Sequence, residues 1–113
     1  MTDYKRGDVI LVRFIFSDET GERQRPAVIV SSGAYHKSRR EAIIAAITSR
    51  TDRILLGDHF IDNWEGAGLL FPSVATGIIR TIKQGMIAKK LGIMPVPDMK
   101  RINGNLRDVL ELK

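Results

Sequence analysis

The residues Arg25-Pro26-Ala27-Val28-Ile29-Val30-Ser31-Ser32 form one of two apolar, β-branched runs that decide how this chain folds. Such runs, bounded by polar residues, are typical of β-strands with a buried face. Pro26 has no amide hydrogen and therefore suits the start of a strand, and it restrains the preceding Arg25 to an extended backbone. The sequence thus predicts a strand over 25–32 with an arginine at its mouth.

The second run extends from Ala42 to Ser49 and is rich in isoleucine and alanine. It predicts a tightly packed strand that ends in two hydroxyl side chains, Thr48 and Ser49. If the two strands lie near each other in one sheet, these hydroxyl groups and Arg25 can share a site. A guanidinium beside hydroxyl groups is what a small, metal-free site for phosphodiester cleavage requires.

The length and composition of the chain limit the number of domains and the kinds of site that it can form. At 113 residues and 12.7 kDa, we expect a single domain over 1–113 with one hydrophobic core. The absence of cysteine excludes a disulfide framework, a thiolate metal site and a cysteine nucleophile. The first residues lack an apolar signal core, and no apolar run reaches membrane-spanning length. We therefore expect a cytoplasmic protein with no membrane partner.

The basic charge of the chain is unevenly distributed. The formal net charge is +5 and the pI is near 9.9. No Asp or Glu occurs from Gly66 to Pro97, and this stretch holds Arg80, Lys83, Lys89 and Lys90. A second basic cluster consists of Lys37, Arg39 and Arg40. Such faces suit a nucleic acid or an acidic protein segment, whereas the alternative is that the charges are merely solvated.

The remaining segments predict further short strands and one terminal helix. Strands are expected over 9–16, 53–56, 78–82 and 86–91, a turn of helix at 33–40, and a short helix or compact loop at 60–70. After Pro97 and Asp98, apolar residues recur at helical spacing, namely Met99, Ile102, Leu106, Val109 and Leu110. We therefore expect a mainly β fold, a strongly curved barrel with short helices and a C-terminal α-helix.

Several short motifs follow one another in a specific order along almost the whole chain. They occupy residues 6–12, 25–32, 47–50, 68–73 and 81–82, followed by the closing helix. Together they resemble the MazF/PemK-type toxins, the mRNA interferases of bacterial toxin–antitoxin pairs. The resemblance implies an SH3-like β-barrel of the CcdB/PemK type that forms a homodimer. It also implies metal-independent, sequence-selective cleavage of single-stranded RNA in a groove across or beside the dimer interface, without a cofactor.

The same resemblance implies a cognate antitoxin with an acidic, initially disordered tail. Such a tail would fold onto the toxin and occlude the RNA groove. RNA and the antitoxin tail both carry negative charge, so one basic groove could bind either. We therefore expect the two partners to compete, and both to bind more weakly as the salt concentration rises.

By motif match, Arg25 is the candidate catalytic residue. In this type of RNA cleavage the 2′-hydroxyl attacks the adjacent phosphate, and a planar, permanently charged guanidinium stabilises the charge that develops on the phosphate oxygens. Thr48 would position the phosphate or the 2′-hydroxyl, with Ser49 as a further candidate. The alternatives are a surface ion pair of Arg25 with Glu22 or Asp18, and turn capping by the two hydroxyl residues.

Four further basic residues are expected to bind RNA: Arg23, Lys37, Arg80 and Lys83. Arg80 and Lys83 are interpreted as phosphate-binding residues, which position the substrate without reading its sequence. Many family members place an aspartate directly after the Thr-Ile pair, where this chain has Lys83. The loop from Ser17 to Gln24 is expected to cover the site and to influence base preference.

His36 and His59 raise the question of a general base, because histidine titrates near neutrality. Both lie in polar connecting segments without metal-ligand spacing, so we expect surface histidines and no metal site. Trp64 is expected to fill the core rather than to stack on a base.

Two other functions stay open. One is a CcdB-like toxin that binds DNA gyrase without catalysis, and the other is a catalytically degenerate homologue. The presence of Arg25 together with Thr48 favours the nuclease, whereas Lys83 and the missing carboxylate keep the degenerate homologue open.

Overall fold

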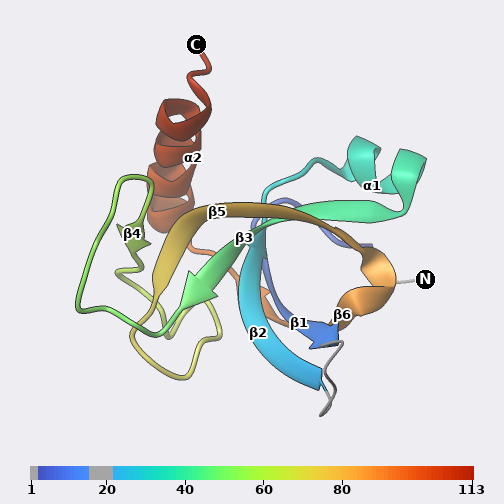
Figure 1. Cartoon of the computed structure of the whole chain (residues 1–113), viewed down its shortest axis with the longest axis horizontal. Helices are drawn as coiled ribbons and strands as arrows, with labels where there is room; N and C mark the ends of the chain where they lie inside the picture. The colour runs from blue at the N-terminus through green and yellow to red at the C-terminus, as the bar shows by residue number, and fades with distance from the viewer. Residues whose placement is uncertain (1–2, 16–21) are drawn as a thin grey trace.

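A strongly curved, six-stranded antiparallel sheet forms the body of the protein in the computed structural model, which describes residues 3–15 and 22–113 (Figure 1). The strand order is β4-β5-β3-β2-β1-β6. The strands are β1 (Asp8–Ile15), β2 (Glu22–Ile29), β3 (Glu41–Thr48), β4 (His59–Phe60), β5 (Val74–Lys83) and β6 (Ile87–Ile93). The helices are α1 (Gly33–Arg39), the 3₁₀ turn η1 (Gln84–Met86) and α2 (Val96–Leu110).

The strands bury residues on both of their faces. On one face, residues such as Val9, Val28 and Ile47 pack with Ile102 and Leu106 of α2. The other face carries a second cluster, which includes Ile10, Val12, Ala27, Ile29, Ala42, Ile44 and Ile82. Because successive strand residues point to opposite faces, burial on both sides requires the nearly continuous apolar runs seen in the sequence. The mainly β prediction with a C-terminal helix is confirmed.

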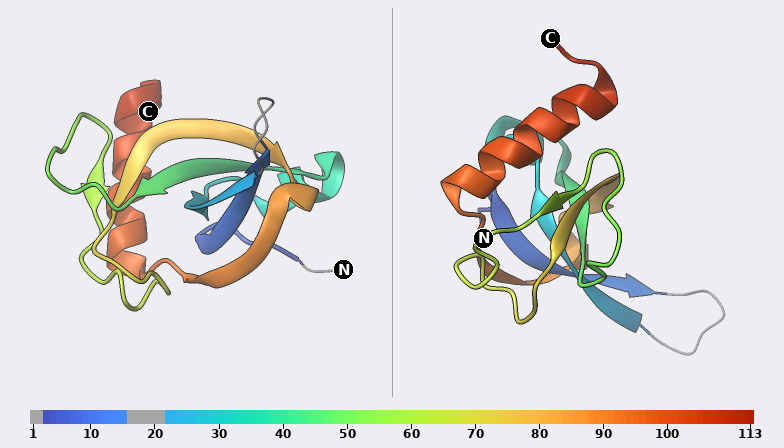
Figure 2. Two further views of the ribbon diagram at one scale, coloured as in Figure 1. Left: turned by 60° about the horizontal axis from the view of Figure 1, so that its bottom comes forward. Right: turned by 90° about the vertical axis from the view of Figure 1, so that its left-hand side faces the viewer.

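Helix α2 lies across one side of the sheet, and its C-terminal end extends beyond the strands (Figure 2). Pro97 lies in the first turn, where its missing amide hydrogen costs nothing, and Asp98 follows it. Ile102 and Leu106 are buried against the sheet, as their spacing predicts. No helix among the described residues is long and apolar enough to cross a membrane.

Strand β5 is longer than predicted, because a bulge interrupts its apolar pattern. Ala45 of β3 pairs with Ile79 of β5, but Ile47 pairs with Ala75. Strand β5 therefore holds extra residues between these two pairs. Thr76 stabilises the irregularity, since its hydroxyl donates to the Ala46 carbonyl at 2.8 Å and accepts the Ile78 amide hydrogen at 3.1 Å. The prediction of 78–82 therefore captured only the second half of this strand.

The strand predicted over 53–56 is wrong. The segment leads into a turn instead. The Asp58 amide donates to the Leu55 carbonyl at 2.9 Å, and the Leu55 amide donates to the Asp58 carboxylate at 3.0 Å. The short strand β4 follows this turn.

The predicted helical turn at 33–40 is confirmed as α1, whose N-cap Ser32 accepts the Tyr35 amide hydrogen. Residue 16 and most of the predicted loop at 17–24 lie outside the described residues.

Candidate functional site

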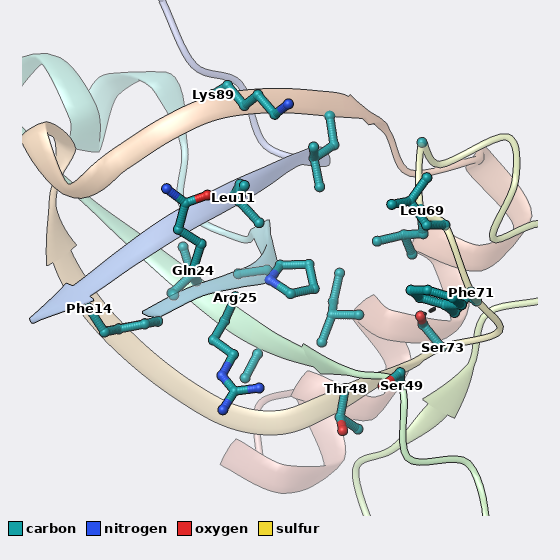
Figure 3. A pocket seen from close by; sticks show the side chains of 18 residues that line it. Leu11, Phe14, Gln24, Arg25, Thr48, Ser49, Leu69, Phe71, Ser73 and Lys89 are labelled. Carbon is teal, nitrogen blue, oxygen red and sulfur yellow. Dashed lines mark hydrogen bonds between the residues drawn. The ribbon is translucent and has the colours of Figure 1, made fainter. Parts of the chain in front are cut away.

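A pocket of about 990 Å³ opens where β2 and β3 separate (Figure 3). The pairing of these two strands ends with Ala27 opposite Ala46. Arg25 and Thr48 each lie two residues beyond this last pair, so the alternation of side chains puts them on the same face of the sheet as Ala27 and Ala46. Both residues line the pocket, one on each strand. The structure therefore brings together the two groups that the sequence analysis paired.

The pocket walls come from five parts of the fold. These are β1, the first half of β2, the end of β3, the segment 68–73 and strand β6. The lining residues with polar side chains are Gln24, Arg25, Thr48, Ser49, Ser73 and Lys89. The apolar lining includes Leu11, Phe14, Leu69, Leu70, Phe71 and Leu91. This combination of an apolar surface with a few donors and two cations suits an anionic ligand that also carries flat or apolar groups.

Arg25 is exposed and has no hydrogen bond or ion pair with another described residue. The ion-pair alternative concerned Asp18 and the side chain of Glu22, which lie outside the described part of the structure. Pro26 follows Arg25 within β2, and Arg25 itself is paired with Val12 of β1. The backbone of this arginine is therefore held in a strand, while its guanidinium stays available to a ligand.

Thr48 ends β3 and also caps the turn that follows. Its Oγ1 accepts the amide hydrogen of Arg50 at 3.1 Å. This bond orients the hydroxyl group, and the hydroxyl hydrogen can still be donated to a bound phosphate. Ser49 is exposed beside it and lines the same pocket.

The four predicted RNA-binding residues occupy different places. Arg80 stacks its guanidinium over the Phe14 ring, 4.8 Å from the centroid, and Phe14 lines the pocket. Arg23 is paired with Phe14 across β1 and β2. Lys83 pairs with Glu41 in the sheet, Lys37 is exposed on α1, and neither lines the pocket. The fold thus places Arg23 and Arg80 near Phe14 at the pocket rim and does not bring Lys37 and Lys83 into it.

Gln24, Phe71 and Lys89 are lining residues that received no individual role from the sequence, although Gln24 ends the loop expected to cover the site. Lys89 was noted only as one charge of the acid-free stretch. It lies opposite Leu11 in the β1–β6 pairing, a relation between distant segments that no local pattern reveals. Phe71 and its neighbour Leu70 are 63% and 82% exposed. The motif at 68–73 was the available sequence signal for this wall, whereas the exposure of its apolar residues is visible only in the structure.

The expectation that both histidines are surface residues is wrong, because both are buried. The His36 ring bonds Ser31 Oγ through Nε2 at 2.6 Å and the Tyr4 carbonyl through Nδ1 at 3.0 Å. His59 Nε2 donates to the Asp98 carboxylate at 2.7 Å. Each polar segment folds back onto the barrel, where its histidine satisfies buried partners. Neither histidine lines the pocket.

Asp98 links the first turn of α2 to the segment 59–63. Its Oδ1 accepts from His59 and from the Asp62 amide at 2.8 Å, and its Oδ2 accepts from the Asn63 amide at 3.2 Å. Burial by itself raises the pKa of Asp98, but these hydrogen bonds outweigh burial and hold the pKa below its ordinary value. Among the described residues, one group could supply ligand atoms to a metal: His59, Asp62 and Asp98, with atoms within 4.8 Å of one another. Because the His59 ring and two backbone amides all donate to this carboxylate, we interpret the group as a hydrogen-bonded contact between α2 and the segment 59–63.

Comparisons with known proteins agree with this architecture. A family model described as "PemK-like, MazF-like toxin of type II toxin-antitoxin system" matches residues 5–110. The chain therefore belongs to the PemK-like, MazF-like toxin family, as its motifs predicted. A search of curated protein sequences found no match.

Solved structures show the same fold as this chain. A chain of the MazE-MazF crystal structure from Deinococcus radiodurans has a TM-score of 0.84 at 16% identity, with both chains covered completely. An endoribonuclease in complex with its cognate antitoxin, from Mycobacterial species, has a TM-score of 0.76 at 22% identity and 97% coverage of both chains. The Mycobacterium tuberculosis toxin MazF-mt6 has a TM-score of 0.75 at 18% identity, covering 94% of this chain and 98% of that one.

Proposed function

We propose that this toxin-family protein is a metal-independent endoribonuclease that cleaves single-stranded RNA in the pocket between β2 and β3. The observation that carries the proposal is the position of Arg25 and Thr48 on the two separating strands of one pocket. Two structural relatives, an endoribonuclease from Mycobacterial species and the Mycobacterium tuberculosis toxin MazF-mt6, support the same activity. An RNA substrate also favours a cytoplasmic location.

The chemistry proceeds by attack of the 2′-hydroxyl oxygen on the adjacent phosphorus, and the hydroxyl proton is released to water. The new P–O bond forms as the bond to the 5′ oxygen breaks and that oxygen takes a proton from water, so the products are a cyclic phosphate and a 5′-hydroxyl end. Arg25 bonds two phosphate oxygens and stabilises the charge that grows on them. Thr48 donates its hydroxyl hydrogen to the same phosphate and fixes its orientation. Ser49 adds a second hydroxyl at this end of the pocket.

The partners follow from the family and from the surface. The relatives include complexes with MazE and with a cognate antitoxin, which supports an antitoxin partner for this chain. The net charge of +5 favours an acidic partner. A homodimer is supported by large apolar residues left exposed on α2 and on the turn before β4. These include Val96, Leu110 and Leu56, which are 68%, 52% and 85% exposed. A second copy would remove such side chains from water.

The test is cleavage of a long, mixed-sequence single-stranded RNA in excess EDTA. Wild type is expected to cut at a short motif and to leave 5′-hydroxyl ends. Arg25→Ala is expected to slow cleavage about 100-fold or more, because one preorganised donor to the transition state is lost. Lys100→Ala is the matched control, since Lys100 is an exposed cation on α2 outside the pocket.

Two results would contradict the proposal. If cleavage survives Arg25→Ala, the assigned site is wrong. If folded wild type cuts no RNA, the degenerate homologue or the CcdB-like alternative replaces the nuclease, and inhibition of DNA gyrase becomes the measurement that separates them.

A further inference from the structure

The pocket has a second part that faces away from Arg25. Successive residues of β2 point to opposite faces, so Gln24 and Pro26 lie on the face that Arg25 does not share. In Figure 3 the Gln24 and Arg25 side chains point in opposite directions. Leu11 pairs with Pro26 on one side and with Lys89 on the other. We call this four-residue surface of Gln24, Pro26, Leu11 and Lys89 the shelf.

The floor of the shelf is apolar yet incompletely buried. Leu11 and Pro26 are half-buried, whereas Val9 and Val12 of the same β1 strand have no exposed surface. Phe71, which also lines the pocket, is 63% exposed. An apolar floor with an aromatic side chain in the same pocket suits a heteroaromatic ring that stacks or packs against it.

The two polar residues of the shelf have no partner among the described residues. Lys89 makes no ion pair, whereas the neighbouring Lys90 bonds the buried Asp8 carboxylate at 3.2 Å. Gln24 likewise makes no hydrogen bond with a described residue. Both side chains line the pocket and are exposed. They are therefore available to the edge of a bound ring.

The chemistry of these groups discriminates between bases. The Gln24 amide donates and accepts, so it can pair with adjacent donor and acceptor atoms on any base edge. The Lys89 ammonium donates only, so it bonds a ring carbonyl but finds no acceptor in an exocyclic amino group. Uracil and guanine carry ring carbonyls next to an N–H group. Cytosine at C4 and adenine at C6 carry an amino group where uracil and guanine carry this carbonyl, and cytosine shares only the C2 carbonyl with uracil.

We propose that the shelf binds a uracil or guanine base of the RNA, and that Lys89 selects these carbonyl bases over cytosine and adenine. This inference rests on the proposed RNA substrate. It assigns base selection to the face of β2 opposite the one that holds the scissile phosphate. Lys89 is then a specificity residue and takes no part in the bond-breaking step.

The test measures binding without cleavage, using the full-length protein and 2′-O-methyl hexanucleotides, which have no free 2′-hydroxyl. Uridine and cytidine hexamers are matched in size and charge. They differ at C4 of the base, where uracil carries a carbonyl next to an N–H group and cytosine carries an amino group. Fluorescence anisotropy at fixed salt is expected to give about tenfold tighter binding of the uridine hexamer. Lys89→Met is expected to reduce this ratio to about twofold or less. Lys89→Arg keeps a donor and is expected to retain the preference for uridine. The control Lys100→Ala is expected to retain this preference as well.

The outcomes separate this inference from the proposed function. Equal wild-type affinity for these two hexamers, together with equal affinity for guanosine and adenosine hexamers of the same backbone, would overturn the shelf and leave RNA binding intact. An equal loss of affinity for both hexamers in Lys89→Met would also overturn it, because that pattern belongs to a phosphate contact. If no hexamer binds, the proposed RNA function itself fails. Mapping the cleavage ends of a mixed-sequence RNA then distinguishes uracil from guanine at the selected position.

Discussion

The Thr48 hydroxyl group has two tasks that a substitution can separate. It caps the turn by accepting the Arg50 amide hydrogen, and it is proposed to donate to the phosphate. Thr48→Val keeps the shape and removes the hydroxyl, so we expect the single-turnover cleavage rate to fall about 10- to 100-fold. Thr48→Ser keeps the hydroxyl and should retain most of the rate.

Thermal unfolding of the two Thr48 variants provides the control. Loss of a single exposed cap is expected to lower stability by about 1 kcal/mol. Wild-type cleavage by Thr48→Val would mean that the hydroxyl only caps the turn.

Asp98 is expected to make stability depend on acid pH. Because its pKa is lower in the folded state, the carboxylate contributes stability above its unfolded pKa of about 4. That contribution is lost as the pH falls through the folded pKa. Asp98→Asn should lower the free energy of unfolding at pH 7 by roughly 1–3 kcal/mol and weaken the acid dependence. Urea unfolding between pH 7 and pH 3 measures both effects.

Asp108→Asn is the matched control on the same helix, because Asp108 is exposed. Its unfolding free energy should stay within about 0.5 kcal/mol of wild type. A wild-type pH profile in Asp98→Asn would show that the hydrogen bonds from the segment 59–63 add no stability.

At the scale of elements, the segment 68–73 contacts β6 through backbone that leaves no room for a side chain. Gly68 has φ of +86°, and a Cβ added there would lie 2.2 Å from the Leu91 carbonyl oxygen. Gly68→Ala is therefore expected to cost about 2 kcal/mol or more of folding free energy. It should also slow RNA cleavage, because this segment forms one wall of the pocket. Denaturant unfolding and the cleavage assay measure the two losses.

Gly104→Ala is the contrasting variant, since a Cβ at Gly104 meets nothing within 4 Å. Gly104 lies in the interior of α2, so alanine should raise the unfolding free energy by up to about 1 kcal/mol. If Gly68→Ala were as stable as wild type, the close contact between segment 68–73 and β6 would not restrict position 68 to glycine.

At the scale of the whole molecule, the net charge of +5 predicts salt-sensitive RNA binding. Each phosphate neutralised on a single strand contributes about −0.7 to the slope of log K against log salt. Arg80→Ala should therefore make the slope shallower by about this amount, because Arg80 lies beside the pocket residue Phe14. Titrations of an uncleavable oligonucleotide at several salt concentrations measure the slope. An unchanged slope would remove Arg80 from the phosphate contacts.

Local patterns in the sequence determined the fold class and most of the strands. The apolar runs of β1, β2 and β3 are continuous because these strands are buried on both faces, and helical spacing marked α2. The family motifs likewise pointed to Arg25 and Thr48, which the fold places in one pocket. Apolar periodicity predicted the strands incorrectly where a bulge or a turn broke the pattern, as at Thr76 and at 53–56.

Relations between distant segments were decided only by the tertiary structure. The pairing of β1 with β6 brings Lys89 to Leu11, and the docking of α2 brings Asp98 to His59, 39 positions away in the sequence. The pocket itself exists because β2 and β3 separate beyond Ala27 and Ala46. Hydrophobic periodicity reports which face of a strand is buried. It carries no information about which strands become neighbours or where they part, because packing of the whole chain sets both.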